Sequence, residues 1–120
     1  MATASFEAHI RHQARVAIID LQGEINNFAA DTLDSAYMEA VSGHPETILL
    51  NFSQVDYMNS VGIALIVGML KRALKAKCPL MVYGLSEHFV EIFRITRLAD
   101  FMLIFSDEAQ ALNSIPPSRS

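Results

Sequence analysis

The sequence predicts a single-domain α/β fold with a mixed, mostly parallel β-sheet of four to five strands and about four helices. Two observations predict it: short apolar runs alternate with segments of helical periodicity, and 52% of the 120 residues are hydrophobic. Strands that alternate with helices form βαβ units, in which helices cover parallel strands. The length suits one hydrophobic core. We expect one domain over residues 1–115, followed by a flexible tail at 116–120 that starts with two prolines.

Five segments have the pattern of strands. An edge strand at 6–12 and a stronger strand at 15–21 are separated by a short turn, so we expect them to pair in antiparallel fashion. The run at 47–52 is almost continuously apolar, as expected for a strand buried on both faces. A similar run at 80–84 is expected beside it in the sheet centre, and a last strand at 101–105.

Four segments have helical periodicity. The first spans 28–41, with Asn27 as its N-cap and Phe28 on its buried face. The second spans 61–77, with Ser60 as its N-cap. The two shorter helices are expected at 87–94, after a capping Ser86, and at 107–113.

The composition limits the classes of function. The formal net charge of -4 makes nucleic acid a poor partner, because phosphate neutralisation needs clustered Lys and Arg. The only cysteine, Cys78, has no second cysteine in the chain with which to form a disulfide. No secretory signal is recognisable, and the apolar run at 61–70 is too short to span a bilayer. We therefore expect a cytoplasmic protein with no membrane contact, as a monomer or weak homodimer.

The junction at 55–63 joins a predicted buried strand to a predicted helix. A serine at the start of this helix has two interpretations. It can be a plain N-cap, which contributes about 1 kcal/mol of helix stability. It can also be a phosphoacceptor, because the positive helix end accommodates the charge of about -1.5 to -2 on a phosphoserine. Gly62, which costs up to ~1 kcal/mol relative to Ala in a helix, would permit close approach of the sheet or of a partner. The expected apolar stripe consists of Ile63, Ile66, Val67, Leu70 and Leu74.

Two motifs resemble those of a known family. Asn59-Ser60-Val61-Gly62 is similar to the D-S-[ST/V]-G-[IL] junction of STAS domains, and residues 21–26, Leu-Gln-Gly-Glu-Ile-Asn, resemble the family's L-x-G-E-L-D turn. The resemblance covers residues 6–112. It is closest to the anti-sigma factor antagonists of bacterial partner-switching systems, which regulate sigma-factor-dependent transcription.

The resemblance implies a regulatory cycle. In this family the unmodified antagonist binds an anti-sigma factor that is also an ATP-dependent serine kinase, and the sigma factor is released. The kinase then phosphorylates the junction serine, which ends binding, and a metal-dependent serine phosphatase restores the antagonist. ATP and metal belong to the partners, so this chain would be no enzyme and would need no cofactor. Carried over, the phosphorylated residue is Ser60, and the partner-binding residues are Gly23, Glu24, Asn26, Asn27, Asn59, Ser60, Val61 and Gly62.

The chain departs from the family pattern at Asn26 and Asn59, where Asp is usual. Asn keeps the capping ability but lacks the charge. A nearby phosphate would be repelled less, whereas an Arg or Lys of the kinase would lose a charged partner. These positions leave an alternative open: a STAS module that binds partners without being phosphorylated, as a scaffold in a signalling complex or a transporter assembly.

Other chemistries have weaker support. A phosphoaspartate receiver domain needs paired acids to hold Mg²⁺, but Asp20 is followed by Leu21. The four histidines lack metal-ligand spacing, so no metal site is expected. The sequence contains no phosphate-binding glycine motif.

Overall fold

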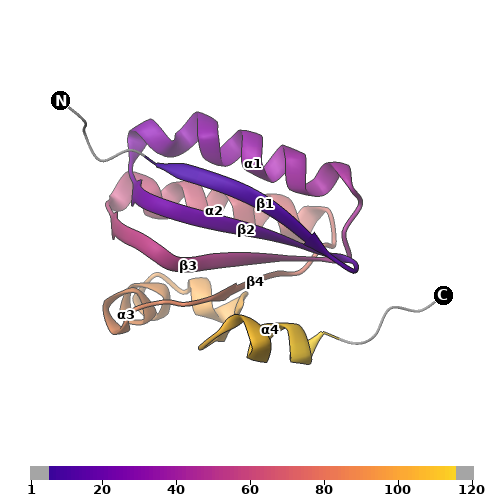
Figure 1. Ribbon diagram of the computed structural model, residues 1–120. Coiled ribbons are helices and arrows are strands. Elements are labelled where there is room, and N and C mark those ends of the chain that lie inside the picture. Colours follow the sequence, from indigo (N-terminus) through magenta and orange to yellow (C-terminus); the bar gives the residue numbers. More distant parts are fainter. Residues whose placement is uncertain (1–5, 116–120) are drawn as a thin grey trace.

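The computed structural model describes residues 6–115, which form one mixed sheet with helices packed on both faces (Figure 1). The predicted α/β fold is confirmed. The tail predicted at 116–120 lies outside the described residues. The strands are β1 (Glu7–Gln13), β2 (Val16–Ile25), β3 (Thr47–Met58), β4 (Leu80–Tyr83) and β5 (Leu103–Phe105). The helices are α1 (Ala30–Ser42), α2 (Ser60–Lys75), α3 (Glu87–Ile95) and α4 (Glu108–Ser114), with short 3₁₀ turns η1 (Asn27–Ala29) and η2 (Leu98–Asp100).

The strands follow the order β1-β2-β3-β4-β5 across the sheet. β1 pairs antiparallel with β2, and the other neighbours pair in parallel, which confirms the predicted antiparallel edge. Parallel strands have their carboxyl ends at the same edge of a sheet. The ends of β2 and β3 and the starts of α1 and α2 therefore share one end of the molecule, on the left in Figure 1.

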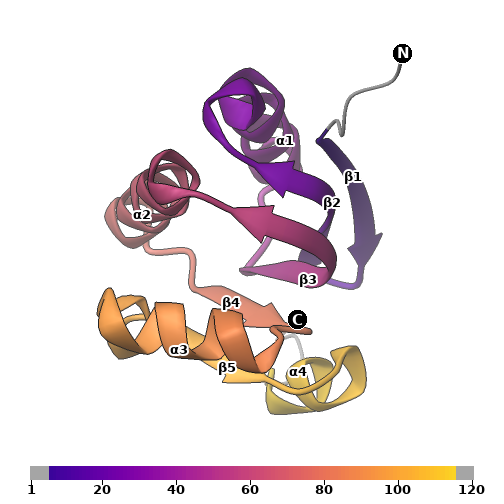
Figure 2. The ribbon, with the colours of Figure 1, turned by 90° about the vertical axis from the view of Figure 1, so that its left-hand side faces the viewer.

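The helices bury the two faces of the sheet unequally. The larger core lies between the sheet and α1, α2 and α3, and it encloses fully buried residues such as Ile19, Leu50 and Val82. α4 covers part of the opposite face (Figure 2). There Ala111 belongs to a smaller buried cluster with Ile18 and Leu49. Because β3 is covered on both faces, its first half is apolar at successive positions, as the sequence predicted.

β2 and β3 both extend beyond their predicted ends. The two strands stay paired through a register shift after Gly23, which adopts a positive φ of 102°, and the pairing continues to Ile25 opposite Met58. A bulge of this kind suits glycine, which adopts positive φ at little cost. Gly23 and Glu24 therefore lie within β2 and not in a turn. The prediction of a short third strand was wrong because the polar residues Ser53, Gln54 and Asp56 interrupt the apolar pattern, whereas the ladder to β2 holds them extended.

β5 is shorter than the predicted strand at 101–105. The amides of Phe101 and Met102 donate to the carbonyl of Leu98, which closes the η2 turn. These two residues therefore belong to the turn and leave Leu103–Phe105 to pair with β4. Local hydrogen bonding within the turn accounts for the difference.

Candidate functional site

Ser60 is the first residue of α2 and is exposed to solvent. Its predicted role as N-cap was wrong: Asn59 is the N-cap, with an extended backbone and a side-chain Oδ1 that accepts the Gly62 amide at 2.9 Å. Because Asn59 performs the capping, the Ser60 hydroxyl is not needed for it. None of the hydrogen bonds found within residues 6–115 uses the Ser60 side chain.

Gly62 lies where the first turn of α2 meets the end of β2. A Cβ atom at this position would be 2.0 Å from the carbonyl oxygen of Ile25 and 2.8 Å from Cγ of Met58. The amide of Asn59 also donates to the Ile25 carbonyl at 3.3 Å. The predicted close approach is confirmed, and the sheet is what α2 approaches. The junction is thereby held rigidly behind Ser60.

The buried face of α2 differs slightly from the predicted stripe. Ile66 and Leu70 are buried as predicted, but Leu74 is 52% exposed. Met69 and Ala73 face the core in addition to Ile66 and Leu70. Ile66, Met69, Leu70 and Ala73 follow the helical spacing i, i+3, i+4, i+7. Leu74 lies one residue beyond this pattern and turns to solvent.

The segment that enters α1 has a similar architecture. Asn26 is the N-cap of η1, and its Oδ1 accepts the Phe28 amide at 2.9 Å. The predicted cap, Asn27, is one residue too late, and Phe28 is 86% exposed while Ala29 is buried. A shift of one residue turns each side chain by about 100° around a helix. The prediction of a buried Phe28 was wrong for this reason.

Both asparagines that stand where the family usually has Asp are thus N-caps. An N-cap needs a short side chain with an acceptor oxygen, and Asn and Asp perform this role about equally well. Asn26 and Asn59 therefore retain the structural function of the position and lack only its charge.

The structure divides the predicted site residues into three sets by burial. Gly23 and Gly62 are buried and shape the backbone, and Glu24, Asn26 and Asn59 are half-buried. Those whose side chains are exposed to a partner are Asn27, Ser60 and Val61. They share one end of the molecule, because α2 begins against Ile25 and α1 follows shortly after it.

Sequence reasoning missed two exposed aromatic residues at this end. Phe28 lies between the η1 cap and α1, and Tyr57, opposite Glu24 in the β2–β3 ladder, is 53% exposed. The signal for Tyr57 was its place two residues before the junction motif. Nothing in the sequence around Phe28 indicated that its side chain is exposed, because its neighbours fit a helix that buries Phe28 equally well.

A groove between α1 and α2 continues from this end along the helices. Its lining includes Ala30 and Ala64 near the junction and Gly68 further along. At the far end the Arg72 guanidinium lies 4.4 Å from the centroid of the Tyr37 ring and forms an ion pair with Asp34. These contacts join α2 to α1 and fix the walls of the groove.

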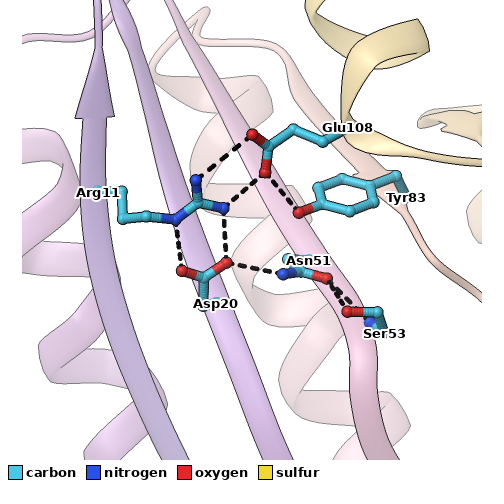
Figure 3. Close-up of polar contacts among 6 residues, drawn as sticks. All are labelled: Arg11, Asp20, Asn51, Ser53, Tyr83 and Glu108. Carbon is cyan, nitrogen blue, oxygen red and sulfur yellow. Dashed lines mark hydrogen bonds and ion pairs between the residues drawn. The ribbon is translucent and has the colours of Figure 1, made fainter.

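A second polar cluster lies on the α4 face of the sheet (Figure 3). We call it the Arg11 network; it consists of Arg11, Asp20, Asn51, Ser53, Tyr83 and Glu108. Arg11 contacts Asp20 Oδ2 at 2.6 Å and Glu108 Oε1 at 2.6 Å, and Glu108 accepts the Tyr83 hydroxyl at 2.7 Å. Asn51 donates to Asp20 at 2.7 Å. The network connects α4 to β1 and β4.

The network also sets the ionisation of its acids. Burial pushes the pKa of Asp20 up, but hydrogen bonds from Arg11 and Asn51 outweigh burial and lower it. Hydrogen bonds from Arg11 and Tyr83 lower the pKa of Glu108. The Asp20 carboxylate thus accepts its hydrogen bonds from side chains of the same chain. This agrees with the weak sequence support for a receiver-type site.

No group of three His, Cys, Asp or Glu side chains within residues 6–115 is arranged to hold a metal ion. None of the helices in that range is long and apolar enough to cross a membrane.

The fold and the site together define a class of protein: a five-stranded α/β domain with a capped strand-to-helix junction. The family model of the STAS domain matches residues 7–111, so the chain belongs to the STAS domain family. The predicted resemblance over residues 6–112 is confirmed.

Relatives and solved structures agree with this assignment. The anti-sigma-B factor antagonist of Listeria monocytogenes is 27% identical over 92 residues, which cover 77% of this chain and 81% of the relative. An anti-sigma factor antagonist from Mycobacterium paratuberculosis has a similar crystal structure, with a TM-score of 0.82, 19% identity, and coverage of 95% of this chain and 97% of that chain. The Bacillus cell fate determinant SpoIIAA in its phosphorylated form is also similar, with a TM-score of 0.71, 21% identity, and coverage of 91% and 99%.

Proposed function

We propose that this chain is an anti-sigma factor antagonist whose binding is switched off by phosphorylation of Ser60. The unmodified protein binds an anti-sigma factor that is also a serine kinase, and the sigma factor is released. Phosphorylation ends binding, and a metal-dependent phosphatase restores the unmodified form. In this cycle the chain acts by binding and catalyses no step itself.

The exposed Ser60 hydroxyl at the start of α2 carries this proposal. The first amides of a helix have no intrahelical acceptor, and they make its N-terminus favourable for negative charge. A phosphate on Ser60 would therefore change the charge and bulk of the surface without displacing the Asn59 cap. The relative from Listeria monocytogenes and the similarly folded, phosphorylated SpoIIAA support the proposal.

The first test is phosphorylation by the serine kinase of the same genome. Incubation with the purified kinase and ATP, followed by mass spectrometry, should add one phosphate to wild type and none to Ser60→Ala. The matched control is Ser53→Ala, because Ser53 is also an exposed serine but lies within β3 and donates its hydroxyl to Asn51 Oδ1 at 2.6 Å. Ser53→Ala should be phosphorylated like wild type.

The second test measures binding to the anti-sigma factor. Ser60→Ala should bind persistently in the presence of ATP, whereas Ser60→Asp should bind at least ten-fold more weakly than wild type, because a charge then occupies the contact. Equal affinities for the two variants would contradict a switch at Ser60.

A second candidate function follows from the two asparagine caps. Asn26 and Asn59 supply the acceptor oxygens that the structure needs but no charge for a kinase to hold. A scaffold module that binds partners in a signalling complex or transporter assembly, without phosphorylation, needs no such charge. Absence of phosphate on Ser60 together with retained partner binding would favour this function.

A further inference from the structure

Three large hydrophobic side chains are exposed on the elements that meet at the Ser60 end of the molecule. Phe28 is 86% exposed, Tyr57 is 53% exposed and Val61 is 43% exposed. Phe28 follows the Asn26 cap by two residues, Tyr57 is the next-to-last residue of β3, and Val61 is the second residue of α2. We call these three residues the apolar anchor. Exposed aromatic residues on a rigid surface are typical of residues that contribute most to a protein interface.

The backbone under the apolar anchor is fixed before any partner arrives. The Phe28 amide is held by Asn26, Tyr57 is paired opposite Glu24 in the ladder, and Val61 precedes the closely packed Gly62. Residues held in this way lose little conformational entropy on binding. The arrangement therefore favours docking without rearrangement of the backbone.

The stretch of chain that carries the apolar anchor has acidic residues and no Lys or Arg. Residues 16–70 contain no Lys or Arg, but they contain seven acids: Asp20, Glu24, Asp31, Asp34, Glu39, Glu46 and Asp56. Asp20, Asp34 and Glu46 form ion pairs with Arg residues. Glu24, Asp31 and Asp56 form none within residues 6–115, and they flank the anchor in sequence or in the ladder. A complementary surface would be basic.

We propose that the apolar anchor, with Phe28 as its principal residue, docks into an apolar pocket edged by Lys and Arg on the anti-sigma factor. This inference rests on the proposed function and assigns the chemistry of the partner surface. The anchor supplies most of the affinity, and the acidic rim, by which we mean Glu24, Asp31 and Asp56, accelerates association. Ser60 and Val61 are both exposed on the first turn of α2, so a phosphate on Ser60 would lose part of its water where this turn contacts the partner. Desolvation explains why a dianion weakens binding even to a basic partner.

The test compares Phe28→Ala with Phe101→Ala in binding to the purified anti-sigma factor. Phe101 is 61% exposed, but it lines a pocket with Lys77 and Pro79 at the opposite end of α2. Phe28→Ala should weaken binding by roughly thirty-fold, mainly through faster dissociation. Phe101→Ala should stay within about two-fold of wild type. Thermal unfolding of each variant checks that the fold is retained, and Phe28→Leu should give an intermediate loss.

The salt dependence of the association rate distinguishes the contribution of the acidic rim from that of the anchor. The association rate of wild type should fall several-fold between about 0.05 and 0.5 M NaCl. In the Asp31→Asn/Asp56→Asn double variant it should depend less on salt. Phe28→Ala should keep the salt dependence of wild type.

The outcomes distinguish this inference from the proposed function. If Phe28→Ala binds like wild type while Ser60→Asp still binds weakly, the proposed function stands and the anchor is overturned. If wild type does not bind the anti-sigma factor at all, both fall. If sedimentation shows that the anchor instead joins two copies of this chain, the assignment of the partner is wrong.

Discussion

The Arg11 network and the junction at 59–62 are two polar regions of one sheet, and they use their side chains differently. In the network, Arg11 donates hydrogen bonds to both Asp20 and Glu108, and this attaches α4 to the sheet (Figure 3). At the junction, Asn59 and Gly62 fix the backbone, and the side chains of Ser60 and Val61 face solvent. Polar groups with partners inside the chain stabilise the fold, whereas a rigid backbone with outward side chains is suited to recognising another molecule.

The largest expected effect tests the rigidity of the junction. Gly62→Ala should lower the free energy of unfolding by about 2–3 kcal/mol, because the new Cβ would overlap the Ile25 carbonyl. Gly68→Ala is the matched control on the same helix, since nothing lies within 4 Å of its Cβ position. It should be neutral or stabilise the helix by up to ~1 kcal/mol. Denaturant unfolding measures both, and equal stabilities would contradict the close approach.

The next effect tests the network. Arg11→Met should lower the free energy of unfolding by about 1–2 kcal/mol, because two acids lose their charged partner at a partly exposed site. Amide hydrogen exchange in α4 should accelerate. Arg15→Met removes a single exposed ion pair with Glu46 and should cost less than about 0.5 kcal/mol. Unchanged exchange in α4 would show that the network does not hold this helix.

The N-cap gives a smaller effect at the junction. Asn59→Ala should cost about 1 kcal/mol, because the Gly62 amide loses its acceptor. Asn59→Asp keeps the acceptor and adds a favourable charge, so stability should be retained or rise by a few tenths of a kcal/mol. We expect Asn59→Asp to change the phosphorylation rate of Ser60 more than stability. A large loss of stability with an unchanged rate would contradict this separation.

The smallest effect is the acid sensitivity of the network. The pKa values of Asp20 and Glu108 are lower in the folded protein than their usual values near 3.9 and 4.3. The stability they contribute is therefore present above those usual values and is lost as the pH falls through the lower folded values. Unfolding measured between about pH 5 and pH 2 should show a steeper loss in wild type than in Arg11→Met. Parallel curves would mean that Arg11 does not control these acids.

Element types were predictable from the sequence, but several boundaries were not. Periodicity located the five strands and four α-helices that residues 6–115 form, and Ser86 caps α3 as predicted, with its Oγ accepting the Phe89 amide at 3.2 Å. The extensions of β2 and β3 depend on pairing between residues 20–25 and 51–58. The sequence of either segment alone does not indicate this pairing, because polar residues interrupt the hydrophobic pattern of a strand.

Within the candidate site, the sequence indicated Ser60 but not its surroundings. The capping roles of Asn26 and Asn59 depend on where each helix begins, and a shift of one residue reverses which side chains are buried. Phe28 changed from a predicted core residue to the most exposed large hydrophobic residue in the described part of the chain for this reason. The function of the predicted site residues stays a prediction until binding and phosphorylation are measured.

By itself, the sequence determined the order of strands and helices, the antiparallel edge and the junction that carries Ser60, because hydrophobic periodicity and capping residues act over a few neighbours. Only the tertiary structure decided that Gly62 contacts Ile25, that Phe28 faces solvent, and that Arg11 reaches Glu108 across 97 residues of sequence. These contacts join segments that are distant along the chain, and local patterns carry no information about which distant groups will meet.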